Sequence, residues 1–186
     1  MLNILILYYS RDGAVHKLAQ HIARGVNSVD GVEAVVRTVP CNKENRESFL
    51  APEVEFEEIE ICHGLALGSP THFGNMAGEM KQFIDTLTPL WLKGSLEGKV
   101  GTVFTSSGSL HGGNETTLIS MQMPLQHLGM ITMGVPYSVK ELNTTKSGGT
   151  PYGASNTGGK ALTQDEEKIA FAQGKRIAEL TAKLHR

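Results

Sequence analysis

Short apolar segments and helix-like segments alternate along the chain, and this alternation limits the folds that it can adopt. The first apolar segment, Leu2 to Tyr9, contains one polar residue, Asn3, as expected of a strand that is covered on both faces. Apolar residues then recur at steps of three and four, the spacing of a helix with one buried face. Those residues are Val15, Leu18, Ala19, Ile22 and Val26. Val32 to Val39 reads as a second strand, which ends before Pro40.

The rest of the chain repeats this alternation. Residues 41–53 are polar and irregular. Beyond them we expect a short helix at Val54–Ile61, a strand at His63–Gly68, a helix at Met76–Leu87, a strand at Val100–Thr105, a helix at Glu115–Leu128 kinked at Pro124, and a strand at Met130–Tyr137. Thr163-Gln164-Asp165-Glu166 forms a capping box, which predicts that a last helix begins there and runs to about Leu184.

Alternation of this kind requires parallel strands joined by right-handed crossovers, with helices on both faces of the sheet. The predicted fold is therefore α/β, a doubly wound five-stranded parallel sheet of order 2-1-3-4-5. In such sheets ligands bind beyond the carboxyl ends of the strands, at the switch between strands 1 and 3. The loops at those ends, Ser10–Val15, Gly68–Asn75 and Ser106–Asn114, are the least regular parts of this sequence.

Composition narrows the possible partners and compartment. With 186 residues, 40% of them hydrophobic, the chain can form one domain, residues 1–186, with long loops. Its net charge of -2 leaves no basic stripe for nucleic acid. The apolar start is too short for a membrane span and no basic residues precede it. Cys41 and Cys62 fit neither a disulfide framework nor a metal site, so we expect a cytoplasmic protein without a bound metal.

The first loop, Ser10–Val15, joins a strand to a helix. Its backbone N–H groups and the helix dipole suit a phosphate group. A serine and a glycine at such a turn are also common where only an N-cap is needed, so this simpler reading stays open. A carboxylate at Asp12 disfavours a phosphate unless it turns outward, towards solvent or a reductant, or unless Arg11 offsets its charge.

The other two loops offer polar groups of different kinds. Backbone amides, His72 and an aromatic residue in Gly68–Asn75 could line the edge of a flat heteroaromatic ring. Taken alone, this segment reads more simply as a helix-capping loop with Asn75 as the cap. Ser106–Asn114 supplies hydroxyls and flexible backbone, but it lacks the G-x-S-x-G elbow of a serine hydrolase. Cofactor binding is therefore the better interpretation of the third loop.

Several motifs together resemble one family over nearly the whole chain. They are Tyr8-Tyr9-Ser10-x-x-Gly13, Gly68-Ser69-Pro70-Thr71-x-Phe73-Gly74-Asn75-Met76, Trp91, Ser107-Gly108-Ser109-x-His111-Gly112-Gly113-x-Glu115-Thr116-Thr117, His127-x-Gly129-Met130 and Gly148-Gly149-Thr150-Pro151-Tyr152-Gly153-Ala154. The chain resembles the WrbA family, which consists of FMN-dependent NAD(P)H:quinone oxidoreductases with a flavodoxin-like fold. Family members are commonly homotetramers whose sites are closed by neighbouring subunits.

The resemblance implies a role for each loop. The FMN phosphate would be held by Ser10, Arg11, Asp12, Gly13, Ala14 and Val15. The isoalloxazine edge would be held by Thr71, His72 and Phe73, and the ribityl chain and ring by Ser106, Ser107, Gly108, Ser109, Leu110 and His111. Trp91 and His127 would border the space over the flavin where the quinone and the nicotinamide alternate, and His127 could donate a hydrogen bond to the quinone oxygen. Without the resemblance, Trp91 would read as a packing residue and His127 as an exposed histidine at a helix end.

Two positions depart from the family pattern. Position 12 is ordinarily aromatic, yet here it is Asp12, and the position of His72 is ordinarily arginine. The predicted reaction passes a hydride from NADH or NADPH to FMN and then two electrons to the quinone, in a ping-pong sequence. Two alternatives remain open: an electron-carrying flavodoxin, which the net charge of -2 disfavours, and a flavin-free scaffold or regulatory protein.

Overall fold

The computed structural model describes residues 1–41, 51–159 and 161–185. In chain order the elements are β1 (Leu2–Tyr8), α1 (Ala14–Val26), β2 (Val32–Thr38), α2 (Phe56–Ile61), β3 (Gly64–His72), β4 (Asn75–Met76), α3 (Gly78–Asp85), α4 (Thr88–Lys93), β5 (Val100–Ser107), α5 (Asn114–His127), β6 (Ile131–Thr132), α6 (Glu141–Thr144), β7 (Ala154–Thr157) and α7 (Gln164–Leu184). The predicted irregular segment 41–53 falls largely outside the described residues. None of the described helices has the length and apolar character needed to cross a membrane.

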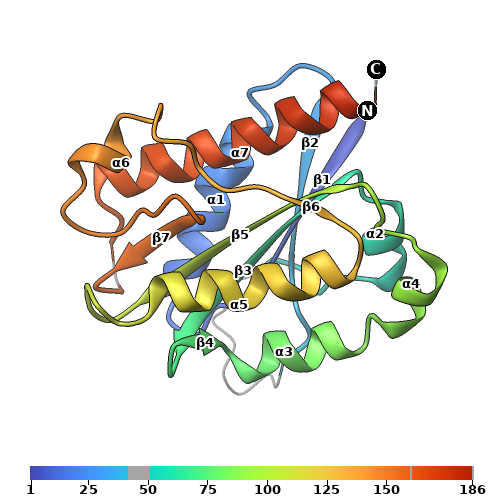
Figure 1. Cartoon of the computed structure of the whole chain (residues 1–186), viewed down its shortest axis with the longest axis horizontal. Helices are drawn as coiled ribbons and strands as arrows, with labels where there is room; N and C mark the ends of the chain where they lie inside the picture. The colour runs from blue at the N-terminus through green and yellow to red at the C-terminus, as the bar shows by residue number, and fades with distance from the viewer. Residues whose placement is uncertain (42–50, 160, 186) are drawn as a thin grey trace.

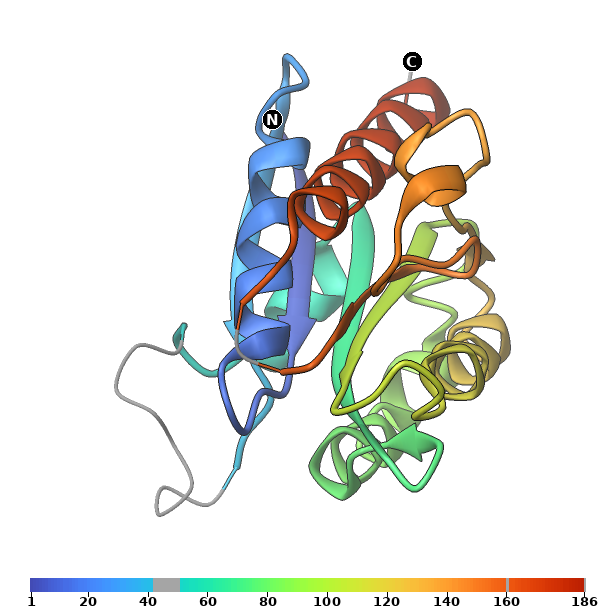
Figure 2. The ribbon, with the colours of Figure 1, turned by 90° about the vertical axis from the view of Figure 1, so that its left-hand side faces the viewer.

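The central sheet has the strand order β2-β1-β3-β5-β6, and neighbouring strands along this path are parallel (Figures 1 and 2). Helices α1 and α7 cover one face, whereas α3 and α5 cover the other. The predicted doubly wound fold and its strand order are confirmed. The carboxyl ends of β1, β3 and β5 consequently meet at one edge of the sheet.

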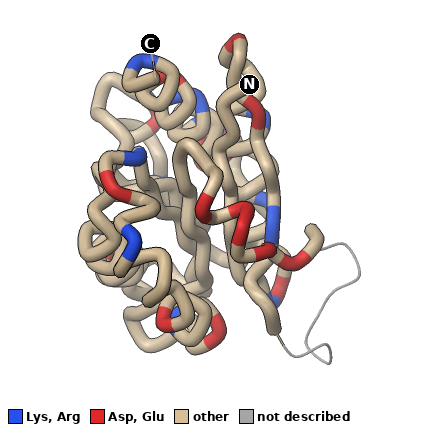
Figure 3. The backbone as a smooth tube through the Cα atoms, turned by 90° about the vertical axis from the view of Figure 1, so that its right-hand side faces the viewer, with Lys and Arg blue, Asp and Glu red and all other residues tan. Residues whose placement is uncertain are grey.

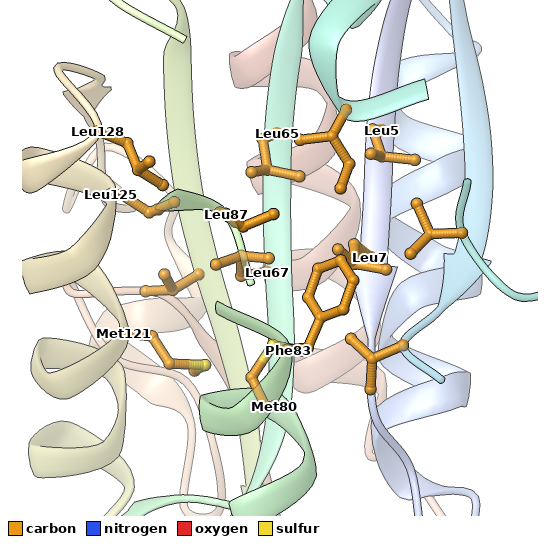
Figure 4. Packing of buried hydrophobic residues seen from close by; sticks show 14 of the residues in the cluster. Leu5, Leu7, Leu65, Leu67, Met80, Phe83, Leu87, Met121, Leu125 and Leu128 are labelled. Carbon is orange, nitrogen blue, oxygen red and sulfur yellow. The ribbon is translucent and has the colours of Figure 1, made fainter. Parts of the chain in front are cut away.

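Two apolar layers hold the sheet between its helices. Side chains along β1 alternate between the layers, as the two-residue period of a strand requires. Ile4 and Ile6 pack with Leu18 under α1 and α7, while Leu5 and Leu7 face the opposite layer. Figure 4 shows this opposite layer, in which the labelled side chains are Leu5, Leu7, Leu65, Leu67, Met80, Phe83, Leu87, Met121, Leu125 and Leu128.

The predicted strand Met130–Tyr137 is wrong in its extent. Only Ile131 and Thr132 form β6, which pairs with the first residues of β5, and β7 pairs with the last four residues of β5. The fifth position of the sheet is thus shared by two short strands, with residues 133–153 as an excursion between them. Gly134 lies so close to the carbonyl oxygen of Pro151 that no side chain would fit, and Pro136 cannot donate to a ladder.

The predicted helix Met76–Leu87 is present, but its bounds are wrong: it begins later, ends earlier and is followed by a second short helix. β3 continues through His72 and turns back as β4, so α3 starts at Gly78. Pro89 occupies the first turn of α4, a position that needs no N–H group and favours a new helix start. By contrast, α5 runs through Pro124, and the predicted capping box of α7 is present.

The docking of the last helix near the amino edge of the sheet is expected to depend on pH. The backbone N–H of Asn3 donates to Nδ1 of His63 (3.1 Å), and the ring of His63 packs edge-on against His185 with centroids 5.1 Å apart. Burial lowers the pKa of His63, with His185 and Lys99 acting in the same direction. The folded state therefore binds fewer protons at His63 than the unfolded state does. The contribution of neutral His63 to the free energy of unfolding is complete above pH 6.5 and is lost as the pH falls below it.

Urea unfolding between pH 7.5 and 5.5 tests this expectation. His63→Asn keeps an acceptor near the position of Nδ1 but does not titrate, so the free energy of unfolding should fall less over this range than in the wild type. The same substitution at the exposed His111 serves as the control and should keep the wild-type pH dependence. An unchanged pH profile in His63→Asn would show that another group controls the acid limb.

Candidate functional site

A hollow of about 130 Å³ lies where the carboxyl ends of β1, β3 and β5 meet, at the lower edge in Figure 2. All three predicted loops contribute to it. The predicted site residues that line it are Ser10, Arg11, Asp12, Ala14, Val15, Thr71, His72, Ser106, Ser107 and Gly108. Pro70 and Gly159 also line it, although sequence reasoning did not select them. Gly13, Phe73, Ser109, Leu110 and His111 belong to the same loops but are not part of the lining.

The first loop directs the amino terminus of α1 towards this hollow. The Ser10 hydroxyl accepts hydrogen bonds from the N–H groups of Gly13 (3.1 Å) and His16 (3.4 Å), and Gly13 takes a left-handed conformation with φ of 85°. The N–H groups of Ala14 and Val15, which lie between these two donors in the chain, have no acceptor among the described residues. Two free amides at the positive end of a helix form an anion-binding site.

Arg11 and Asp12 form an ion pair at the rim. The Arg11 Nη2 and Asp12 Oδ2 atoms are 3.0 Å apart, and the two side chains are 60% and 68% exposed. The Asp12 carboxylate raises the pKa of Arg11, mainly through their hydrogen bond. Asp12 is thus both turned outward and offset by Arg11, the arrangement that a nearby phosphate requires. The same pairing reduces the charge that Arg11 can offer to a ligand.

The second loop is a tight hairpin between β3 and β4. Phe73 and Gly74 form its turn with φ of 52° and 74°, and the Phe73 side chain is fully exposed. A positive φ at a phenylalanine is strained, and such strain is concentrated at functional sites. Asn75 is not the helix cap, as one interpretation of the sequence proposed: the cap is Ala77, and Asn75 lies in β4.

Two hydrogen bonds of Ser107 close the third loop and join it to the segment after β7. The Ser107 hydroxyl donates to the carbonyl of Ser109 (2.8 Å), which closes the loop on itself. The N–H of Gly158 donates to the carbonyl of Ser107 (3.0 Å). This bond holds the segment after β7 beside the loop, so that Gly159 can form part of the lining.

Glu166 anchors the same wall, a role that sequence reasoning missed. The side chain is fully buried, and its two carboxylate oxygens accept four hydrogen bonds of 2.8–3.0 Å. The donors are the N–H groups of Gly148, Thr157 and Thr163 and the side-chain amide of Asn156. Glu166 therefore fixes the end of β7 and the start of α7 relative to each other. The capping box pointed only to the Thr163 contact, because the other donors lie outside its four residues.

Trp91 and His127 lie together but line a different hollow. This hollow has a volume of about 880 Å³ and lies between α3, α4 and α5, and its lining also includes Met123. Trp91 and Met123 are 54% and 55% exposed. In the single chain, then, these two predicted catalytic residues do not line the hollow formed by the three loops.

Comparison with known proteins identifies the family. The profile of the family described as NADPH-dependent FMN reductase matches residues 3–144. The chain belongs to this family. It is 42% identical over 203 aligned residues, with 100% of both chains covered, to a protein from Syntrophobacter fumaroxidans named "NAD(P)H dehydrogenase (quinone)". A protein of that name from Acidithiobacillus ferrooxidans is also 42% identical, with 99% of both chains covered.

Solved structures agree with the flavodoxin-like fold of this FMN reductase family member. A "flavodoxin, WrbA-like protein" from Agrobacterium tumefaciens superposes with a TM-score of 0.73 at 18% identity, covering 98% of this chain and 99% of that one. Oxidised Flavodoxin 2 from Bacillus cereus gives a TM-score of 0.63 at 21% identity, with 98% and 99% covered. The predicted resemblance to WrbA-type proteins is confirmed.

The residues around the smaller hollow fit one end of FMN. The free amides of Ala14 and Val15 suit its phosphate, and a buried nitrogen of His72, Nε2, has no partner among the described residues. A volume of about 130 Å³ is below the 300–1,000 Å³ or so of pockets that enclose drug-sized ligands. The hollow can therefore take the phosphate and part of the ribityl chain, while the ring would lie at the mouth.

Proposed function

We propose that this chain is an FMN-dependent NAD(P)H:quinone oxidoreductase that acts as one domain, residues 1–186. The proposal rests on one observation above all: in a member of the FMN reductase family, three loops meet in a phosphate-sized hollow beside the switch between β1 and β3. The names of the full-length relatives support the quinone as acceptor. FMN, once bound, supplies the chemistry of accepting a hydride and passing on two electrons.

The chain's own residues would bind the FMN, orient it and enclose its phosphate end. The Ala14 and Val15 amides would bind the phosphate, Ser106 would contact the ribityl chain, and Thr71 would lie at the edge of the ring. Phe73, fixed at the hairpin turn, supports the edge of the ring. No side chain is needed as an obligatory acid or base for hydride transfer. Since both substrates would use one space above the ring, ping-pong kinetics follow.

We further propose that four chains assemble and that Trp91 and His127 complete the site of a neighbouring subunit. The larger hollow is mostly apolar, and its charged side chains, Lys81 and Asp85, are paired at 2.6 Å. An exposed apolar surface of this kind marks a protein interface. Through this contact His127 could donate a hydrogen bond to a quinone oxygen over the partner's ring.

Titration of the apoprotein with FMN tests the proposed function. Binding should saturate at one flavin per chain, and benzoquinone should then be consumed with NADH or NADPH in parallel-line steady-state patterns. A dissociation constant above about 1 mM, a binding free energy of roughly 4 kcal/mol, would contradict the proposal and favour a flavin-free role. A one-electron product as the main product would favour the electron carrier. Figure 3 shows both acidic and basic residues on the face in view, and the net charge of -2 is small for a carrier that docks on basic partners.

Asp12 should set the affinity for the pyridine nucleotide. A carboxylate at the rim repels the nucleotide phosphates, although Arg11 offsets part of its charge. An exposed contact of this kind is worth about 0.2–1 kcal/mol, so Asp12→Tyr should lower the Michaelis constant for NAD(P)H by a factor of roughly 1.4 to 5. The advantage should shrink as salt rises, and FMN affinity should change little.

Asp30→Tyr is the matched control, because Asp30 is exposed and lies in the turn between α1 and β2, at the opposite edge of the sheet. It should leave the nucleotide constant unchanged. Loss of FMN binding in Asp12→Tyr, with nucleotide kinetics unaltered in the protein that retains flavin, would instead place Asp12 in the phosphate loop.

A further inference from the structure

The larger hollow, with its volume of about 880 Å³, is lined by one face of each of two helices. The lining residues are Gly78, Lys81, Ile84 and Asp85 of α3 and Ser120, Met123, Pro124 and His127 of α5. Residues three and four apart lie on the same face of a helix, so each set forms a stripe along its helix. The larger hollow therefore runs lengthwise between α3 and α5, which lie side by side in Figure 1.

The two ends of the larger hollow differ. Asn75 and Gly78 lie at one end, beside the hairpin of β3 and β4. Trp91 of α4 and His127, the last residue of α5, lie at the other. The α3 helix has eight residues, so at 1.5 Å per residue the larger hollow is about 12 Å long.

The floor of the larger hollow is apolar. Met76, Leu87 and Leu128 are buried side chains that line it. Ile84 and Pro124 add partly buried apolar surface between them. Such a floor binds a hydrocarbon chain by removing it from water.

Several polar side chains of the larger hollow are already satisfied within the chain. Lys81 and Asp85 are paired at 2.6 Å. The hydroxyls of Thr88 and Ser120 each donate to the backbone carbonyl three residues earlier, at 3.2 and 2.8 Å. Among the described residues that line this hollow, Lys81 is the one lysine or arginine. No fixed cation is therefore left unpaired for the phosphates of a pyridine nucleotide.

The α4 end carries two hydrogen-bonding side chains without a partner. The indole N–H of Trp91 and the ring nitrogens of His127 make no hydrogen bond to any of the described residues. Both side chains can donate to a carbonyl oxygen. A ligand that matches this hollow thus has a carbonyl-bearing head at the α4 end and an apolar chain along the floor.

We propose that the larger hollow binds the hydrocarbon side chain of the quinone, so that the acceptors of this enzyme are quinones with a short prenyl or alkyl chain. This inference rests on the proposed function. The carbonyl head lies at Trp91 and His127, and the chain follows α3 towards Gly78. An isoprene repeat of four chain carbons spans about 5 Å at ordinary bond lengths, so about two repeats fill the length of about 12 Å.

The proposed assembly and the binding of a hydrocarbon chain use different parts of the larger hollow. Trp91 and Met123 are half exposed at its mouth, where a neighbouring subunit would contact them. The buried side chains of the floor lie beneath and stay available to the quinone. A subunit over the mouth would also shield the hydrocarbon chain from water on its open side, which strengthens binding.

The fluorescence of Trp91 measures this binding without turnover, because Trp91 is the one tryptophan of the chain and lines the larger hollow. The full-length protein is titrated with menadione and with the same ring carrying one, two or four isoprene units. The dissociation constant should fall at least about tenfold from menadione to two units and change less than about twofold from two units to four. A steady fall through four units would indicate general adsorption to apolar surfaces, and equal constants would show that the chain is not bound. Either result would overturn the proposal.

Gly78→Phe tests the placement of the chain. A Cβ atom at Gly78 would meet no atom within 4 Å, so the phenylalanine ring has room to enter the far end of the larger hollow. The advantage of two isoprene units over none should then fall below about threefold. Gln164→Phe, the same side chain at the exposed first residue of α7 on the opposite face of the sheet, should keep the wild-type advantage.

The outcomes separate this inference from the proposed function. FMN titration shows that each variant is folded, and a wild-type advantage in folded Gly78→Phe would overturn the placement of the chain. Equal affinity for menadione and its prenylated forms, in a protein that binds FMN and reduces benzoquinone, would overturn this inference alone. Failure of the wild-type protein to bind FMN would overturn the proposed function and, with it, the assignment of the hollow to an acceptor.

Discussion

Replacing Glu166 by glutamine is expected to destabilise the fold and to weaken FMN binding together. The carboxylate is fully buried and satisfies four donors, two at each oxygen. Glutamine keeps one oxygen but turns its NH₂ group towards two of those donors. Each buried donor left without an acceptor costs about 1–3 kcal/mol, so the loss of two should lower the free energy of unfolding by about 2–6 kcal/mol.

The effect on FMN should follow from the same contacts. Glu166 holds the N–H of Thr157, and the next two residues carry the bond to Ser107 and the lining at Gly159. Displacement of residues 157–159 should raise the FMN dissociation constant at least tenfold, measured by fluorescence titration under conditions where the variant is folded. Glu167→Gln is the control: this neighbour is 44% exposed, and the same change there should alter stability by less than about 0.5 kcal/mol. Equal urea midpoints for the two variants would show that the Glu166 contacts carry no net stability.

The central sheet was predictable because the residue patterns of its strands indicate that they are buried. β1 and residues 64–68 of β3 are largely apolar, and β5 combines valine and phenylalanine with buried threonine and serine. Strands of the apolar kind are covered on both faces. Parallel pairing then places their carboxyl ends at one edge, so the position of the site followed from the element order. To predict which loops form the site, it was enough to recognise the irregular segments that follow these strands.

Short strands and long-range polar contacts were not predictable in the same way. β7, Ala154–Thr157, has three polar residues in its four and becomes a strand because β5 offers unpaired backbone groups beside it. Glu166 was identified as part of a local capping box, yet it also binds Gly148, eighteen residues earlier. Local patterns cannot report partners that only the folded chain brings near.

The placement of Trp91 and His127 has a different cause. The resemblance implied that both border the flavin, but α3, α4 and α5 pack so that the two residues share a separate hollow. An interface between subunits would bring them to a flavin, and a single chain does not contain that interface. In the proposed assembly, their role would depend on whether a neighbouring subunit covers the larger hollow.

A glutamate at Met123 is expected to abolish the proposed assembly. Met123 is 55% exposed in the single chain and lines the larger hollow with Trp91 and His127. Burying an unpaired carboxylate against apolar side chains costs several kcal/mol, and each 1.4 kcal/mol or so is tenfold in a dissociation constant. Met123→Glu should therefore weaken subunit association at least about 100-fold. Sedimentation at micromolar concentration should find four chains in the wild type and one in the variant.

Turnover separates the role of this surface in catalysis from a role in stability. Met123→Glu monomers should stay folded, because the side chain is already half exposed. They should bind FMN with little change, since no residue of α5 lines the smaller hollow. Quinone reduction should fall more than tenfold, because Trp91 and His127 no longer reach a neighbouring flavin. Leu184→Glu makes the same change at a residue 56% exposed at the end of α7 and should leave mass and turnover as in the wild type. Monomers that reduce quinones at the wild-type rate would show that each chain forms a complete site by itself.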